Sequence, residues 1–271
     1  MPELPEVETT RRGVMPHLVH RCVETVIVRH RGLRWPVPRG LEKTLQGQRL
    51  NDVERRAKYL LFRFEAGTLI LHLGMSGHLR VIPADTSVEK HDHLDIVFEG
   101  SRCLRFNDPR RFGSVHWTRG DPLQHPLLEN LGPEPLSGEF DGDILFEQSR
   151  KRRVAVKLFI MNANIVVGVG NIYANEALFL AGIRPGRAAG RVTRQEYARL
   201  AEAIRTVLQK AIAKGGTTLR DFTQPDGNTG YFSIHLNIYD RAGEPCRVCG
   251  GEIRHKVMGQ RATYWCSRCQ E

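Results

Sequence analysis

The chain has 271 residues, a formal net charge of +10 and a pI near 9.6. This length predicts one large or two modest domains plus a small module, and 41% hydrophobic residues suffice for a sizeable core. No apolar run is long enough to span a bilayer, so we expect a soluble protein. The basic excess favours a polyanionic partner, with nucleic acid first and an acidic membrane surface or acidic protein as the alternatives.

The first part of the chain predicts a short helix followed by a β-sandwich. Pro5 suits the first position of a helix and Gly13 its end, with Glu6 and Glu8 in the first turn. Short apolar segments separated by Gly and Pro continue to about residue 118, which is typical of an antiparallel sandwich. These segments are Thr25–Val28, Tyr59–Phe64, Thr68–Leu73, His78–Ile82, Leu94–Phe98, Cys103–Phe106 and Ser114–Trp117.

From about Pro122 the pattern becomes helical. The clearest helix spans 193–214, because Thr193 and Glu196 form a capping-box pattern and two glycines follow Lys214. Residues 217–238 are rich in turn formers and predict a loop. We therefore predict an α+β fold with three domains: a β-sandwich domain with an N-terminal helix (1–121), a helical domain (122–235) and a cysteine-rich module (236–271).

The cysteine-rich module predicts a structural zinc site. Two C-x-x-C pairs lie sixteen residues apart, a spacing typical of four thiolates around one Zn²⁺ with a β-hairpin between the pairs. The four ligands are Cys246, Cys249, Cys266 and Cys269. Four unrelated structural cysteines or two disulfides are the alternatives, but a disulfide framework is not favoured because the chain shows no secretory signal and has room for a core of its own.

Residues outside the cysteine pairs add to this picture. Cys22 and Cys103 stand alone in apolar segments, so we expect them to be reduced and buried. The residues between the pairs are largely basic and would give the hairpin a cationic face for nucleic acid: Arg254, His255, Lys256, Gln260 and Arg261. Further basic clusters lie at 55–58, 110–111 and 150–157.

The N-terminus could carry chemistry. Met1 precedes Pro2, a small residue that permits removal of the initiator methionine and leaves a secondary amine as the first group of the chain. An α-amino group has a reference pKa of about 7.7–8.0, so part of it is neutral and nucleophilic at physiological pH. Such an amine can attack a sugar C1′ and form a Schiff base, with the adjacent Glu3 able to move protons.

An ordered set of motifs runs from residue 2 to residue 269. It comprises Pro-Glu-Leu-Pro-Glu-Val-Glu-Thr at 2–9, Arg-Arg-Ala-Lys-Tyr at 55–59, Leu-Gly-Met-Ser-Gly at 73–77, Lys-His-Asp-His at 90–93, Asp-Pro-Arg-Arg-Phe-Gly at 108–113, Val-Gly-Val-Gly-Asn-Ile-Tyr-Ala at 167–174 and the four cysteines. Together they closely resemble the formamidopyrimidine-DNA glycosylases, bacterial base-excision repair enzymes for oxidised purines.

The resemblance implies a bifunctional glycosylase and AP lyase. Pro2 would be the nucleophile, with Glu3 as the acid that assists base loss and opening of the sugar ring. Lys58 matches the lysine assigned to β-elimination and phosphate contact. Arg261 matches the finger arginine that binds phosphates at the lesion and is linked to δ-elimination. The finger and Pro2 would then serve one active site.

The resemblance also implies how the enzyme holds damaged duplex DNA. Flipping a nucleotide leaves a hole, and the residues matching those that fill it are Met75, Arg110, which would hydrogen-bond the orphaned cytosine, and Phe112. The residues matching backbone contacts are His91, Arg153, Lys157 and Asn171, the last in the turn of a helix–two-turn–helix element. The glycine-rich loop 217–232 resembles the segment that closes over the flipped purine.

Two rival interpretations remain open. The endonuclease VIII branch of the superfamily, which favours oxidised pyrimidines, shares Pro2, Glu3 and the finger, whereas Leu4 and the motifs at 73–77 and 108–113 favour the purine branch. A non-catalytic zinc protein that senses DNA damage would not need Lys58 and Arg261 as well. We expect a monomer in the bacterial cytoplasm, associated with the nucleoid and without a membrane partner.

Overall fold

The computed structural model describes residues 2–215 and 236–271, which form two compact units. The first unit contains residues 2–129 and 215, and the second contains residues 130–214 and 236–271. Met1 and the expected lesion loop 217–232 lie outside the described residues. Within the described ranges, no helix is both long and apolar enough to cross a membrane.

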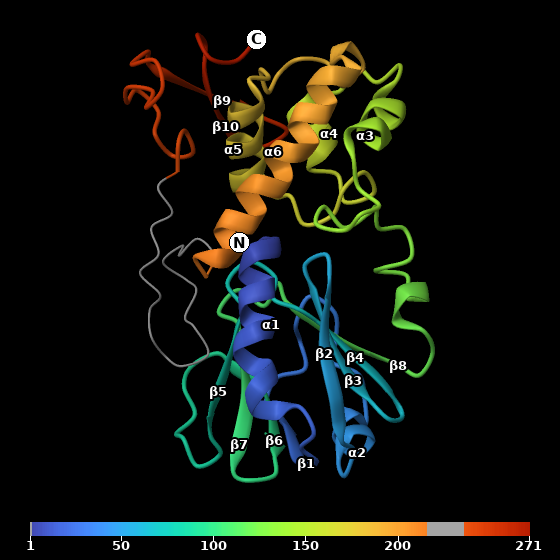
Figure 1. Ribbon diagram of the computed structural model, residues 1–271. Coiled ribbons are helices and arrows are strands. Elements are labelled where there is room, and N and C mark those ends of the chain that lie inside the picture. The colour runs from blue at the N-terminus through green and yellow to red at the C-terminus, as the bar shows by residue number, and fades with distance from the viewer. Residues whose placement is uncertain (1, 216–235) are drawn as a thin grey trace. The chain divides into compact units, whose positions relative to one another are not determined.

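Unit 1 is built on two four-stranded antiparallel sheets (Figure 1). Side chains from both sheets meet in a single buried core, for example Ile96 and Leu104 from one sheet and Phe62 and Leu69 from the other. This is the expected sandwich. The first sheet has the order β1 (Val23–Val28), β6 (Asp92–Phe98), β7 (Arg102–Asn107), β5 (His78–Pro83), and the second β2 (Leu50–Arg56), β3 (Tyr59–Phe64), β4 (Gly67–His72), β8 (Ser114–Thr118).

Two elements of unit 1 were not expected from the sequence: β2 and the short helix α2 (Leu41–Leu45). The buried residues of β2 include Leu50 and Val53, three positions apart, because the pairing with β3 shifts between Leu50 and Asp52. A bulge of this kind breaks the period-two alternation by which strands are recognised.

The N-terminal helix α1 spans Leu4–Leu18 and is longer than expected. The sequence suggested an end at Gly13, but Val14 and Leu18 are fully buried in the sandwich core, and their burial extends the helix. Pro5 occupies the second helical position, and the residue before the helix, its N-cap, is Glu3.

Unit 2 contains the remaining helices and the finger (Figure 1). Helix α6 has the expected capping box, in which Thr193 and Glu196 each accept a hydrogen bond from the other's backbone N–H. The helices are α3 (Gly142–Ser149), α4 (Val156–Ile160), α5 (Asn171–Ala181) and α6 (Arg194–Ala213), with one-turn 3₁₀ segments η1 (Pro122–Gln124, in unit 1) and η2 (Ala189–Arg191).

The finger is a hairpin of β9 (Ile253–Met258) and β10 (Arg261–Cys266). Its turn residues Gly259 and Gln260 have φ values of 54° and 61°, which suits a two-residue turn of the I′ kind. The finger shares a small core with α5, since Phe179 packs with Ile253, Tyr264 and Cys266. The finger is therefore anchored on α5.

Candidate active site and zinc centre

The N-terminal residues lie at the start of a helix. Pro2 is buried and directly precedes Glu3, which is 2% exposed. The backbone N–H of Glu3 donates a hydrogen bond of 2.8 Å to Oε2 of Glu6. This bond fixes the backbone immediately after Pro2, at the positive end of α1.

Lys58 occupies the hairpin turn between β2 and β3, since Arg56 pairs directly with Tyr59. Its neighbour in the turn, Ala57, has φ of 55°. Burial first, and then the positive charge of Lys58, lower the pKa of His72 to about 4. His72 pairs across β3 and β4 with Tyr59, the two rings lying 4.8 Å apart. A neutral imidazole thus lies within the electrostatic range of Lys58.

Met75, Arg110 and Phe112 come from two loops of unit 1. Met75 is half-buried in the turn between β4 and β5, whereas Arg110 and Phe112 are exposed in the loop between β7 and β8. The Arg110 guanidinium carbon lies 4.8 Å from the centre of the Phe112 ring, a cation–π distance. A cation and an aromatic ring therefore protrude together from one loop.

Positive-φ backbone marks several of the candidate positions. Four non-glycine residues with positive φ are candidates or immediate neighbours of one: Ala57 beside Lys58, His91 itself (76°), Arg111 (57°) and Gln260 (61°) beside Arg261. Such conformations cost free energy in residues with a side chain and often occur at functional sites. Positive φ also occurs at residues that are not candidates, such as His20, Ser101 and Asp240, so it does not by itself single out the candidate loops.

In unit 2 the candidate residues Arg153 and Arg261 are exposed, and Asn171 is half-buried at the first position of α5. Gly168, in the turn before this helix, has φ of 80°, as a glycine-dependent turn requires. Within the described residues, Oδ1 of Asn171 has no hydrogen-bond partner. The turn therefore places a helix N-terminus next to a buried amide oxygen that accepts no hydrogen bond within the described residues.

Lys157 is not placed as expected. The side chain is buried, at 0% exposure, and Nζ donates hydrogen bonds of 2.7 Å to the carbonyl of Ala262 and to Oγ1 of Thr263. The surrounding sequence, Val-Ala-Val-Lys-Leu-Phe-Ile, already indicated an apolar environment. Lys157 joins α4 to the finger strand and is not a surface cation for phosphate.

The four finger cysteines fit one tetrahedral metal ion. Their sulfurs all lie within 4.8 Å of one another, with Cys246 and Cys269 3.9 Å apart and Cys249 and Cys266 3.4 Å apart. Zn–S bonds of about 2.3 Å place tetrahedral sulfurs about 3.8 Å apart. All four positions are supplied by protein, as in a structural site. Of the other two cysteines, both free, Cys103 is buried as expected, but Cys22 is only half-buried.

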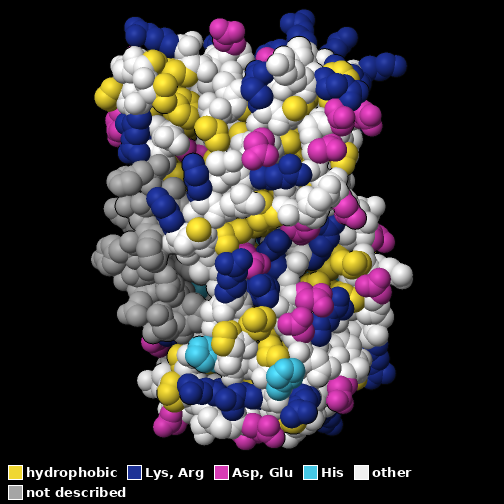
Figure 2. All heavy atoms as spheres, in the orientation of Figure 1, with side chains coloured by type: hydrophobic (Ala, Val, Ile, Leu, Met, Phe, Trp, Pro, Cys, Tyr) yellow, Lys and Arg dark blue, Asp and Glu magenta, His cyan; other side chains and the backbone are white. Residues whose placement is uncertain are grey.

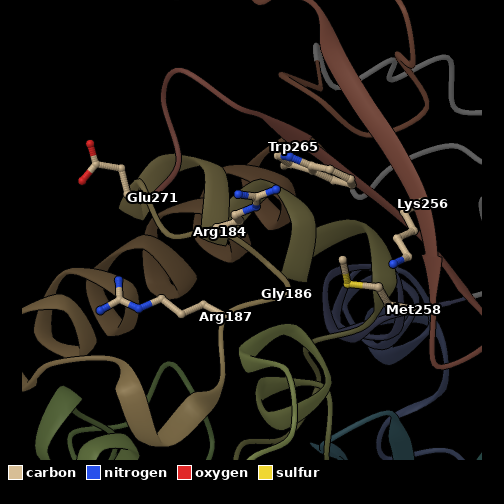
Figure 3. Close-up of a pocket in the computed structure, with 7 residues that line it drawn as sticks. All are labelled: Arg184, Gly186, Arg187, Lys256, Met258, Trp265 and Glu271. Carbon is tan, nitrogen blue, oxygen red and sulfur yellow. The ribbon is translucent and has the colours of Figure 1, made fainter.

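The surface of unit 2 has a hollow beside the finger, of about 460 Å³. Figure 3 shows Trp265 and Lys256 of the finger facing Arg184 and Gly186 across it, with Glu271 at one side.

Basic side chains on the face seen in Figure 2 are spread over each unit with acidic ones among them. The distribution of Lys and Arg side chains therefore does not by itself locate a DNA-binding site on this face.

Three family models match the chain in order. A formamidopyrimidine-DNA glycosylase N-terminal domain matches residues 1–115, a formamidopyrimidine-DNA glycosylase H2TH domain matches residues 131–223, and a zinc finger found in FPG and IleRS matches residues 243–271. The fold and the site thus define a DNA glycosylase with a zinc finger.

Individual proteins give the same result. A formamidopyrimidine-DNA glycosylase of Nitrosococcus oceani is 61% identical over 270 residues, covering 100% of both chains. The MutM (Fpg) structure from Thermus thermophilus has a TM-score of 0.89 at 39% identity, covering 99% of this chain and 98% of that one. Lactococcus lactis Fpg, in complex with DNA containing an abasic site, has a TM-score of 0.91 at 34% identity, covering 99% of each chain. The chain belongs to the formamidopyrimidine-DNA glycosylase family.

Three positions of structural interest were missed from the sequence. Ser76 and Asp108 lie inside the motifs at 73–77 and 108–113, yet neither was assigned a role. His72 could have been found from the alternation of β4, which places it beside Tyr59 on the neighbouring strand.

Proposed function

We propose that this base-excision repair DNA glycosylase removes oxidised purines from duplex DNA and then cleaves the strand on both sides of the abasic sugar. The observation that carries the proposal is Pro2 at the start of α1, followed by the buried Glu3, in a chain whose family matches cover residues 1–115, 131–223 and 243–271. The family takes its name from ring-opened purines, which favours the purine branch over the pyrimidine branch.

The proposed chemistry begins with covalent attack by the chain's first residue. The Pro2 amine attacks C1′, the glycosidic bond breaks, and the base leaves with its bonding electron pair and takes up the proton that the amine nitrogen loses. Glu3 protonates the sugar-ring oxygen as the ring opens, which leaves an iminium between Pro2 and C1′. Because Glu3 directly follows Pro2, its carboxyl group is close enough to give a proton to the sugar that Pro2 attacks.

Strand cleavage follows from the iminium, which acidifies C2′–H. Loss of that proton breaks the C3′–O bond and expels the 3′ phosphate by β-elimination, in which we assign Lys58 a role. Loss of the C4′ proton then breaks the C5′–O bond and expels the 5′ phosphate. Arg261 would bind the phosphates that leave, since an arginine fork matches phosphate oxygens. Its exposed place beside the hairpin turn of the finger supports this role.

We assign Met75, Arg110 and Phe112 to the hole left by the flipped nucleotide, as apolar wedges and a cation that pairs with the orphaned cytosine. His91, Arg153 and Asn171 would hold the DNA backbone. Lys157 is left out of this set because its ammonium group is buried.

The functional domains would be 1–121 for catalysis, 122–235 for the helix–two-turn–helix element with a lesion loop, and 236–271 for the zinc finger. The compact units of the structure divide at 129/130. A monomer acting on the nucleoid in the cytoplasm would suit this activity.

The test is covalent trapping. The protein is incubated with a duplex bearing 8-oxoguanine opposite cytosine, borohydride is added, and a protein–DNA adduct is expected. Pro2→Gly should weaken trapping, and protein that retains Met1 should not trap. A duplex with an oxidised pyrimidine distinguishes the endonuclease VIII branch. DNA binding without any adduct would instead favour the non-catalytic damage sensor.

A further inference from the structure

One buried serine joins the loop of Met75 to the loop of Arg110 and Phe112. Ser76 Oγ donates a hydrogen bond of 2.7 Å to Oδ1 of Asp108 and accepts one of 3.2 Å from the backbone N–H of Arg110. Ser76 is 8% exposed and Asp108 is 0% exposed. Resting on the proposed function, we propose that Ser76 is a positioning residue that holds the two loops as one unit, so that the three hole-filling side chains enter the duplex together.

Asp108 precedes the second loop and also holds the residue that follows it, Gly113. Its Oδ1 receives the Ser76 hydroxyl, and its Oδ2 accepts a hydrogen bond of 2.8 Å from the backbone N–H of Gly113. The residues between, 109–112, therefore form a short loop whose beginning and end are tied to a single buried carboxyl group. The side chains of this loop can protrude without the backbone moving with them.

The same aspartate also fixes the segment of His91. The backbone N–H of Asp108 donates to the carbonyl of His91 at 3.1 Å, and the Asp108 carbonyl lies 2.8 Å from Nε2 of His93. His91 is a proposed backbone contact, so the ties of Asp108 extend from the hole-filling loops to a phosphate-binding position. All of these contacts lie within unit 1.

The two loops also touch through their backbones. Gly74 has φ of 70°, and a Cβ at this position would lie 2.4 Å from the backbone N of Gly113 and the carbonyl carbon of Phe112. This close approach leaves no space for a side chain between the loops. Ser76, two residues further on, supplies hydrogen bonds across this contact.

The direction of the two bonds makes Ser76 hard to replace. A hydroxyl has one proton, and a carboxylate can only accept, so the proton points to Asp108 and a lone pair faces the Arg110 N–H. Alanine removes both bonds, whereas threonine keeps the hydroxyl. The prediction is therefore a specific loss in Ser76→Ala and recovery of function in Ser76→Thr.

The chain offers a matched control. Ser114 is 1% exposed, lies at the start of β8, and has no partner for its hydroxyl within the described residues. Ser76→Ala and Ser114→Ala therefore each remove one buried hydroxyl, but only the first removes a connection between the loops. Melting temperatures of both variants show whether either change acts through stability.

The measurement is single-turnover excision of 8-oxoguanine opposite cytosine and opposite adenine. Ser76→Ala should lower the rate opposite cytosine about ten-fold or more, because it removes two hydrogen bonds and one bond of ordinary strength corresponds to a factor of up to about ten. It should also reduce the ratio of the excision rate opposite cytosine to that opposite adenine by about three-fold or more, because the Arg110 backbone loses its hydrogen bond to Ser76. Ser114→Ala should stay within about two-fold on both counts.

A double variant tests whether Ser76 acts through Arg110. If it does, adding Arg110→Ala to Ser76→Ala costs less than Arg110→Ala costs in the wild-type protein. Additive losses, or an unchanged cytosine preference in Ser76→Ala, overturn the positioning role. Failure of the wild-type protein to form a borohydride adduct overturns the proposed function instead, so the two failures are distinguishable.

Discussion

The ammonium group of Lys157 donates a hydrogen bond of 2.7 Å to Oγ1 of Thr263, and the same hydroxyl donates one of 3.1 Å to the carbonyl of Arg261. A buried lysine on α4 is thus linked through one threonine to the residue assigned to the departing phosphates. Nothing in this chain of bonds requires Lys157 to touch DNA. Its effect on the reaction would pass through the position of Arg261.

Replacing Lys157 by methionine should therefore disturb the finger strand. The change leaves the Ala262 carbonyl and the Thr263 hydroxyl without this donor, which costs about 1–3 kcal/mol for buried polar groups. We expect a lower melting temperature and a smaller share of the δ-elimination product relative to the β-elimination product. Lys210→Met, at an exposed lysine of α6, is the control. An unchanged product ratio would argue against the link to Arg261.

Removal of zinc should unfold the finger and leave the sandwich intact. Since Phe179 of α5 packs in the finger core, we expect loosening to extend into α5 but not into unit 1. DNA binding and cleavage should both be lost. Hydrogen exchange before and after chelation checks this: amides of β9, β10 and α5 should lose protection, whereas amides of β3 and β7 should keep it. Loss of protection throughout unit 1 would contradict the prediction.

A half-buried histidine of unit 1, His116, predicts a pH dependence of stability. Burial, and then the charge of His125, lower the pKa of His116 to about 4. The unfolded chain, with a pKa near 6.5, binds the proton more readily than the folded one, so stability falls as the pH drops from about 6.5 to 4. For this half-buried ring the loss is about 1 kcal/mol, allowing for solvent screening.

His116→Phe should remove this contribution and flatten the curve. Urea unfolding at pH 7, 5.5 and 4.5 measures it, and the variant should lose less stability than the wild type over that range. An equal loss of stability with falling pH in the wild type and in His116→Phe would exclude His116 as a cause.

Carboxylates held by arginines behave differently. Burial raises the pKa of Glu196, but hydrogen bonds from Arg187 and Thr193 outweigh it and lower the pKa to about 2. Glu196 therefore contributes stability that is lost only below about pH 4.5.

The features that could be predicted from sequence are those set by local spacing. The zinc ligands, the hairpin between them and the capping box of Thr193 each depend on residues a few positions apart or on two such pairs. The bulged strand β2 was missed because its pattern is broken. Lys157, expected among the surface cations of 150–157, is buried because its neighbours in the chain are apolar. The Ser76–Asp108 bond joins residues 32 positions apart, and no local pattern reveals it.

The salt dependence of DNA binding tests the phosphate contacts. Each phosphate neutralised by a cationic side chain adds about 0.9 to the slope of log affinity against log salt concentration. We expect a steep slope for the wild-type protein and a slope reduced by about 0.9 in Arg153→Ala. Arg199→Ala, at another exposed arginine of unit 2, should leave the slope unchanged. Titration of an abasic-analogue duplex between about 50 and 200 mM salt measures both. Equal slopes in the two variants would remove Arg153 from the contact set, and a flat wild-type response would contradict the whole set.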